Sequence, residues 1–157
     1  MTRLRGRAPR GERGHDSAPA GHGCTTTMIS SVRLDGTTAC MTIEGSTTAD
    51  VFQAYLQSVL VPTLRPGDVV VLDNLSAHKN PGTAARIVAA GASVRFLPPY
   101  SPDFNPIEKM WGKVKEALRD AKARTPEDLG DAIARALASV TASDAMGWFA
   151  SCGYSIN

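Results

Sequence analysis

The sequence lacks the segments that would place the protein in a membrane or send it out of the cell. None of its apolar runs approaches the roughly 18 residues that a membrane-spanning helix requires. The start is rich in arginine, but no apolar segment follows it as one does in a secretory signal. Cysteine is scarce, and Cys24, Cys40 and Cys152 show neither pairing nor metal-ligand spacing. We therefore expect reduced thiols, a cytoplasmic location and no membrane partner.

Internal repeats are absent as well, and the composition is that of an ordinary globular protein. The 157 residues are 43% hydrophobic and 20% charged. A chain of this length can bury a core of its own. These features predict a single domain rather than an array of repeats.

The positive charge is concentrated at the start of the chain. Residues 1–23 carry five arginines against Glu12 and Asp16, whereas the formal charge of the whole chain is only +2. This segment is also rich in glycine and shows no periodicity. It is typical of a basic arm that contacts phosphates, with Arg3, Arg5 and Arg7 as candidates. A solvated terminus without a binding role is the alternative.

The next segments predict a hairpin and then a helix. Residues 25–33 and 37–44 have the composition of strands, and Asp35-Gly36 between them is a strong hairpin signal. Residues 46–48 offer helix caps, and Pro62 ends the helical pattern. Apolar residues recur at helical spacing in between, at Val51, Phe52, Tyr55, Leu56, Val59 and Leu60.

The first candidate site residue is Asp73. It follows Val69–Leu72, a short, β-branched run that predicts a buried parallel strand. Sheets of α/β proteins place their sites at the carboxyl ends of such strands. An Asp that only caps a turn is the structural alternative.

The second candidate is Glu108. A strand predicted at 94–97 leads into residues 98–102, where three prolines make a stiff connection. Asn105 then suits an N-cap and Pro106 the first helical position, so Glu108 falls in the first helical turn. A capping box is the structural alternative for Glu108. A stiff connector between a strand-end acid and a helix-start acid nevertheless favours a positioned pair.

Further helices are predicted around these two acids. Residues 80–90 form a short helix that Gly91 ends, with His78 in the loop before it. The helix from Pro106 has an apolar side, and residues 109–124 carry six basic residues against two acidic ones. That basic side either binds phosphates or is merely solvated. Another helix begins near residue 126, and Ser143 is expected to cap a last one.

Two stretches carry a family resemblance. They are Leu72-Asp73-Asn74 with His78-Lys79, and LPPYSPDFNPIE over residues 97–108, followed by Trp111 and Lys115. They resemble the DDE-type transposases of bacterial insertion sequences, most closely the mariner-related six-thirty family. The resemblance implies an α/β, ribonuclease H-like fold, with a mixed sheet flanked by helices. It also implies three acids that bind Mg²⁺ or Mn²⁺, of which Asp73 matches the second and Glu108 the third.

The first acid of the family has no match in this sequence. Relatives carry it on their first strand, and the loop that follows that strand resembles residues 1–23. The chain is therefore expected to lack its first strand. Asp35 has a sufficient structural role in its turn, and Asp16 is no better a substitute. The expected division is a basic arm at 1–23, the catalytic domain at 24–124 and a helical extension at 125–157.

The resemblance also assigns roles around the acids. Asn74, His78 and Asn105 are expected to orient the acids or contact DNA. Lys79, Lys109, Lys113 and Lys115 join the arm as candidate DNA contacts. The expected partners are the element's DNA ends, the target DNA, a second copy of the chain and an upstream-encoded segment. The expected location is the bacterial nucleoid.

The expected function is metal-dependent cleavage and transfer of DNA strands. Two Mg²⁺ ions about 4 Å apart activate the attacking oxygen and stabilise the leaving oxygen in such reactions. Hard cations require carboxylate ligands, and the sequence supplies two convincingly. One alternative is an inactive remnant that still binds DNA or a partner. A nuclease that cuts without transposing is another.

Overall fold

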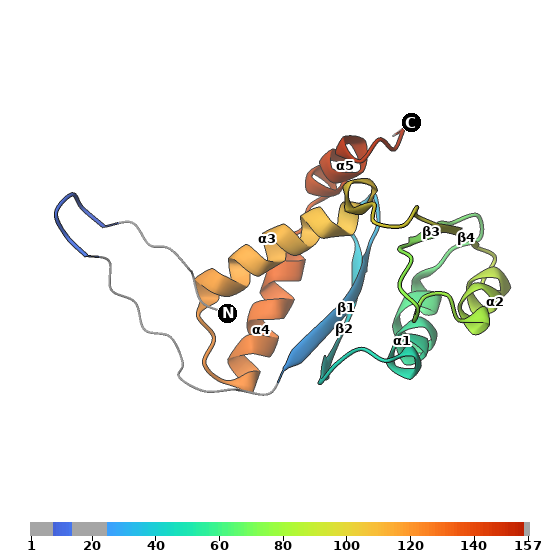
Figure 1. The fold of residues 1–157 in the computed structure, drawn as a ribbon, viewed down its shortest axis with the longest axis horizontal. Helices are drawn as coiled ribbons and strands as arrows, with labels where there is room; N and C mark the ends of the chain where they lie inside the picture. Colours follow the sequence, from blue (N-terminus) through green and yellow to red (C-terminus); the bar gives the residue numbers. More distant parts are fainter. Residues whose placement is uncertain (1–7, 14–24, 156–157) are drawn as a thin grey trace.

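The computed structural model describes residues 8–13 and 25–155, which contain both strands and helices (Figure 1). The mixed α/β class expected from the sequence is confirmed. The elements, in chain order, are β1 (Thr26–Val32), β2 (Thr38–Glu44), α1 (Ala49–Tyr55), β3 (Val69–Leu72), α2 (Pro81–Ala89), β4 (Ser93–Phe96), α3 (Pro106–Ala121), α4 (Pro126–Ala138) and α5 (Ala142–Ser151).

Strands β1 and β2 form the predicted antiparallel hairpin, in which Ile29 pairs with Met41. Asp35 and Gly36, the residues of the hairpin signal, both lie in its turn. Asp35 Oδ1 accepts a hydrogen bond from the Thr37 amide at 2.9 Å, which is the structural role expected of this Asp. Gly36 has a φ of 84° and lies so close to the start of α5 that a Cβ would come within 2.7 Å of the Thr141 backbone.

Helix α1 begins where Thr48 accepts a hydrogen bond from the Val51 amide, and it continues as a π turn and a 3₁₀ turn to Thr63. It buries Phe52, Tyr55 and Leu56 in a core to which the hairpin also contributes. The Tyr55 hydroxyl donates a hydrogen bond to the Ala39 carbonyl at 3.0 Å. Burial raises the pKa of Tyr55 to about 12.

Strands β3 and β4 pair in parallel, from Val69 opposite Ser93 to Leu72 opposite Phe96, with α2 as the crossover. The parallel pairing was predicted, although β4 begins and ends one residue earlier than expected. The prediction that β3 is buried is wrong at its start, because Val69 is 58% exposed. Within the described residues β3 has a strand neighbour on one edge only, and its remaining residues are half-buried.

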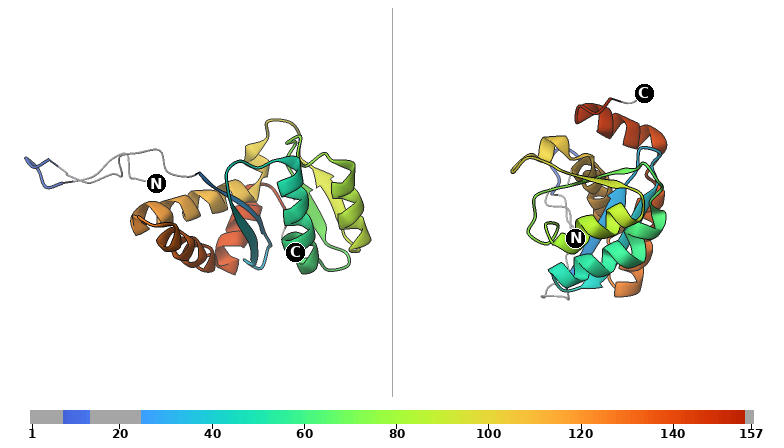
Figure 2. Two further views of the ribbon diagram at one scale, coloured as in Figure 1. Left: turned by 90° about the horizontal axis from the view of Figure 1, so that it is seen from below. Right: turned by 90° about the vertical axis from the view of Figure 1, so that its right-hand side faces the viewer.

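The hairpin lies between α3 and α4 on one side and α1 on the other (Figure 2), and a hydrophobic core lies on each side of it. One face of it, with Met28 and Val32, packs on α3 and α4. The opposite face, with Ile29 and Met41, belongs to the second core, which also contains residues of α1, α2, β3 and β4. This arrangement follows from the alternation of side chains along a strand.

The strands of the described residues form two separate pairs instead of one continuous mixed sheet. Strand β1 pairs only with β2, and β3 pairs only with β4. A cavity of about 840 Å³ lies between the two pairs and is lined by both β1 and β3.

The N-cap of α5 lies two residues before the predicted one. Thr141 is its N-cap, and its hydroxyl accepts a hydrogen bond from the Asp144 amide at 3.1 Å. The Asp144 carboxylate returns the interaction by accepting from the Thr141 amide at 2.9 Å. Ser143, the predicted cap, lies inside the first turn because this reciprocal capping box sets the start of the helix.

Among the residues that the structure describes, no helix is both long and apolar enough to cross a membrane.

Candidate functional site

The cavity between the two strand pairs brings together four of the candidate site residues, namely Asp73, His78, Asn105 and Glu108. Asp73 follows the last residue of β3, whereas Asn105 and Glu108 belong to the start of α3. Strand-end and helix-start residues thus line the same hollow, although they are far apart in the sequence.

The carboxylate of Asp73 has one hydrogen bond and one close neighbour. Its Oδ1 accepts a hydrogen bond from the Leu75 amide at 3.0 Å, so the turn-capping role considered for this Asp is real. Nδ1 of His78 lies 2.6 Å from the same oxygen. The side chain of Asp73 remains 38% exposed, and its Oδ2 takes part in neither contact. Capping a turn therefore leaves this acid accessible to a ligand.

His78 is placed by stacking rather than by hydrogen bonding of its ring. The ring lies on Phe52, with 4.2 Å between the ring centroids, and its side chain is 16% exposed. Nδ1 is buried and, despite its closeness to Asp73, lacks the alignment of a hydrogen bond. Phe52 thus fixes the imidazole against the acid, a role that the helical pattern around Phe52 did not indicate.

Asn74 joins the two halves of the candidate site. Its side-chain amide donates a hydrogen bond to the Leu97 carbonyl, and the Leu97 amide donates to the Leu72 carbonyl at 2.8 Å. Leu97 begins the proline-rich connector that leads to Glu108. The end of β3 and the start of the connector are therefore fastened to each other next to Asp73.

Glu108 is exposed in the first turn of α3. Its amide donates to the Asn105 carbonyl at 3.1 Å, but the Asn105 side chain makes no capping hydrogen bond. Asn105 occupies the N-cap position as predicted, while the capping box considered for Glu108 is not formed. The connector before it is fixed at Phe104, whose carbonyl accepts from the Tyr154 hydroxyl at 2.9 Å.

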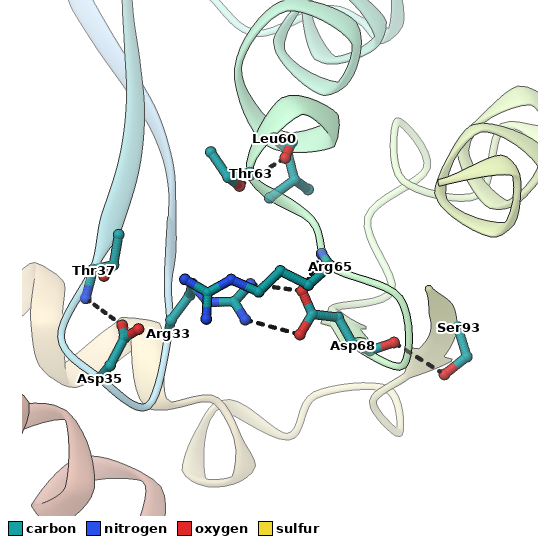
Figure 3. A network of polar contacts seen from close by, with 8 residues as sticks. All are labelled: Arg33, Asp35, Thr37, Leu60, Thr63, Arg65, Asp68 and Ser93. Carbon is teal, nitrogen blue, oxygen red and sulfur yellow. Dashed lines mark hydrogen bonds and ion pairs between the residues drawn. The ribbon is translucent and has the colours of Figure 1, made fainter. Parts of the chain in front are cut away.

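The opposite end of the cavity holds an ion pair that sequence reasoning missed. Both terminal guanidinium nitrogens of Arg33 donate to the Asp68 carboxylate, at 2.7 and 2.8 Å (Figure 3). The Arg65 amide also donates to this carboxylate at 2.8 Å. The hydrogen bonds from Arg33 lower the pKa of Asp68 to about 2. The two partners lie 35 residues apart, so no local signal indicated them.

The donor set for a metal ion is incomplete in the part of the chain that the structure covers. Within 8–13 and 25–155, no group of three or more His, Cys, Asp or Glu side chains is placed to hold a metal ion. Asp73 and Glu108 supply carboxylates to one cavity, which suits a hard cation. Asp35 lines the same cavity but is bonded in its turn, and Asp16 lies outside the described residues.

The candidate DNA-binding lysines differ in their surroundings. Lys79, Lys109 and Lys115 are exposed. Lys113 is engaged within the protein, because its Nζ lies 2.5 Å from the Asp144 carboxylate and donates to the Ser139 carbonyl at 2.8 Å. The hydrogen bond from Lys113 lowers the pKa of Asp144 to about 2. The candidates Arg3, Arg5 and Arg7 lie outside the described residues.

Comparison with protein-family models matches residues 1–130 to the family of DDE superfamily endonucleases. The matched range contains Asp73, Glu108 and the connector between them. A search of curated proteins gives no match. An endonuclease of this superfamily acts on DNA, and such enzymes generally use divalent metal ions.

Proposed function

Because the chain belongs to the DDE superfamily endonucleases, we propose that it is the catalytic domain of a bacterial insertion-sequence transposase of the mariner-related six-thirty family. The motif over residues 97–108 and the pair Asp73 and His78 support this assignment. The proposed fold is ribonuclease H-like, and the proposed reaction is the cleavage and transfer of DNA strands at the nucleoid.

The observation that carries the proposal is the shared cavity of Asp73 and Glu108. These two carboxylates are the proposed ligands of Mg²⁺ or Mn²⁺, which, when bound, would activate the attacking oxygen and stabilise the leaving oxygen. His78 lies against one oxygen of Asp73, with Nδ1 at 2.6 Å. Asn74 fixes the connector that presents Glu108, and Asn105 lines the same wall.

Metal binding by these two acids is the direct test. Trp111 lines the cavity and Trp148 does not, so a Trp148→Phe background leaves one reporter beside the proposed metal. We expect added Mn²⁺ to quench the Trp111 emission, and Asp73→Asn or Glu108→Gln to abolish the quenching. Equal quenching in the parent and in both variants would remove these acids from the proposed site.

We expect the 157-residue chain to nick DNA only weakly, because its described residues bring two acids rather than three to the cavity. The measurement is Mg²⁺-dependent nicking of a supercoiled plasmid, with Asp73→Ala and Glu108→Ala as controls. Robust nicking that both substitutions abolish would contradict this expectation. Asp35 and Asp16 would then be the first places to search for a third ligand.

The incomplete donor set also favours a second candidate function, a catalytically inactive form that binds DNA or a protein partner. The same two assays separate the candidates. An inactive binding form retains salt-dependent DNA affinity, but it shows neither metal-dependent quenching nor nicking. An active domain shows DNA affinity, metal-dependent quenching and nicking.

A further inference from the structure

Residues 98–104 of the connector that presents Glu108 have little support of their own. All of them are exposed except Ser101, which is half-buried, and none belongs to either hydrophobic core. The hydrogen bonds that these described residues make stay within 98–105, with one exception. The exception is the Phe104 carbonyl, which accepts a hydrogen bond from the Tyr154 hydroxyl at 2.9 Å. This contact therefore ties the connector to a part of the chain that is distant in sequence.

The first turn of α3 depends on the connector because it has no side-chain cap. Asn105 occupies the N-cap position without making a capping hydrogen bond, and a helix start leaves its first amide groups without partners in the helix. A 3₁₀ turn, Pro102–Phe104, leads into α3, and the Asn105 amide closes it by donating to the Pro102 carbonyl at 2.9 Å. The Phe104 carbonyl belongs to the peptide unit between this turn and the N-cap. Holding that carbonyl thus sets the direction in which α3 begins.

Tyr154 is held in place by the end of α5. Gly153 has a φ of 85°, which suits glycine, and its amide donates to the Ala150 carbonyl at 3.0 Å. The Tyr154 amide reaches back to the Phe149 carbonyl at 3.1 Å. These two hydrogen bonds are those of a Schellman motif, in which the residue after the glycine often packs on the last helical turn. The Tyr154 ring accordingly lies edge-on to the Phe149 ring, with 5.4 Å between the centroids.

Helix α5 is in turn fastened to α3. The Lys113 ammonium of α3 lies 2.5 Å from the Asp144 carboxylate of α5, and Trp148 packs against the core that contains Val114 of α3. Partial burial raises the pKa of Tyr154, so its hydroxyl keeps the proton that it donates. Helix α5 is therefore a fixed support from which the Tyr154 hydroxyl reaches the connector.

We propose that Tyr154 is a positioning residue of the candidate metal site, because its hydroxyl keeps the first turn of α3, and with it Glu108, at the cavity wall. Tyr154 and Glu108 line the same cavity. Tyr154 lies beyond residues 1–130, so the family match assigns it no role. The helical extension expected at 125–157 is thereby part of the site. The inference rests on the proposed function, since it takes Glu108 to be a metal ligand.

Tyr154→Phe is the test variant, because it removes the hydroxyl and keeps the ring that packs on Phe149. In the Trp148→Phe background, titration of the whole chain with Mn²⁺ gives the metal affinity from the quenching of Trp111. We expect Tyr154→Phe to weaken that affinity about fivefold, which is the size of effect expected from one hydrogen bond. Without metal, we expect the amides in 104–108 to exchange about fivefold faster than in the parent, because the turn before α3 opens more often.

Thr141→Ala is the matched control, since it weakens α5 at its opposite end. It removes the hydroxyl that caps the helix, but it leaves the hydrogen bond between Tyr154 and Phe104 in place. We expect it to change neither the metal affinity nor the exchange in 104–108. All the proteins are compared without denaturant, where their urea unfolding curves show them to be folded. A purely structural role of Tyr154 would lower stability without moving the metal affinity.

Three results would overturn the inference. They are a metal affinity of Tyr154→Phe equal to that of the parent, unchanged exchange in 104–108, and an equal loss of metal affinity in Thr141→Ala. Absence of quenching in the parent would overturn the proposed metal site and this inference with it. Quenching in the parent that Tyr154→Phe leaves unchanged would overturn the inference alone, so the two failures are distinguishable.

Discussion

Tyr100 has a backbone conformation that is unfavourable for its residue type. Its φ is 54°, and its side chain is fully exposed. A left-handed conformation costs a residue with a Cβ about 1–2 kcal/mol, and an exposed ring gains no burial that would offset this cost. Tyr100 lies between the prolines of the connector that presents Glu108. The turn there is thus fixed by its neighbours and not by its own preference.

We expect Tyr100→Asn to raise the free energy of unfolding by up to about 1 kcal/mol, because Asn tolerates positive φ. Tyr100→Ala is the matched control, since it removes the ring and keeps the unfavourable Cβ. Urea unfolding of the three proteins measures the difference. An equal gain in both variants would assign the effect to the ring instead of the backbone.

The positions of the two acids, at a strand end and a helix start, could be predicted from the sequence. The long-range contacts around the cavity could not. Asp73 follows a recognisable strand, and Glu108 follows a recognisable helix start, so short-range signals place both. The stacking of His78 on Phe52 and the pairing of Arg33 with Asp68 join residues far apart in the chain. Such contacts depend on how the elements pack, which no local pattern encodes.

At the level of elements, the start of α5 is set by the reciprocal bonds of Thr141 and Asp144. We expect Thr141→Ala to cost about 1 kcal/mol of stability through the lost cap. Ser143→Ala should have little effect, because Ser143 is exposed within the first turn. Chemical denaturation of both variants tests this, and the reverse order of effects would return the capping role to Ser143.

The Arg33–Asp68 pair predicts a dependence of stability on acid pH. The folded-state pKa of Asp68, about 2, lies below its ordinary value of 3.8. The stabilisation is therefore present above about pH 4 and is lost as the pH falls toward 2. We expect Asp68→Asn to remove this contribution, so its unfolding should depend less on pH over that range than that of the parent. Parallel slopes for the two proteins would contradict the assignment.

The elements also show why burial was harder to predict than secondary structure. The hairpin, the crossover helix and the helix after the proline-rich connector each carry local signals, and all three form where expected. Strand β3 has the composition of a buried strand, yet Val69 is largely exposed. Burial depends on neighbours from elsewhere, and β3 has a described strand neighbour on one edge only.

At the scale of the whole molecule, we expect binding to duplex DNA that weakens as salt increases, because phosphate contacts release counterions. Lys79→Ala, Lys109→Ala and Lys115→Ala should each lower the slope of log affinity against log salt by about one. Lys113→Ala is the matched control and should leave the slope unchanged, since Asp144 holds this ammonium. Gel-shift titrations at several salt concentrations give the slopes, and affinity that ignores ionic strength would refute the prediction.

The hairpin belongs to both hydrophobic cores, through Met28 and Val32 on one face and Ile29 and Met41 on the other. Neither core can therefore be completed before β1 and β2 have paired. The hairpin is also a local structure, closed by a short turn, so it forms at a small cost in loop entropy. Completion of both hydrophobic cores therefore depends on the early pairing of β1 with β2. We therefore expect the two cores to unfold together, as a single cooperative unit.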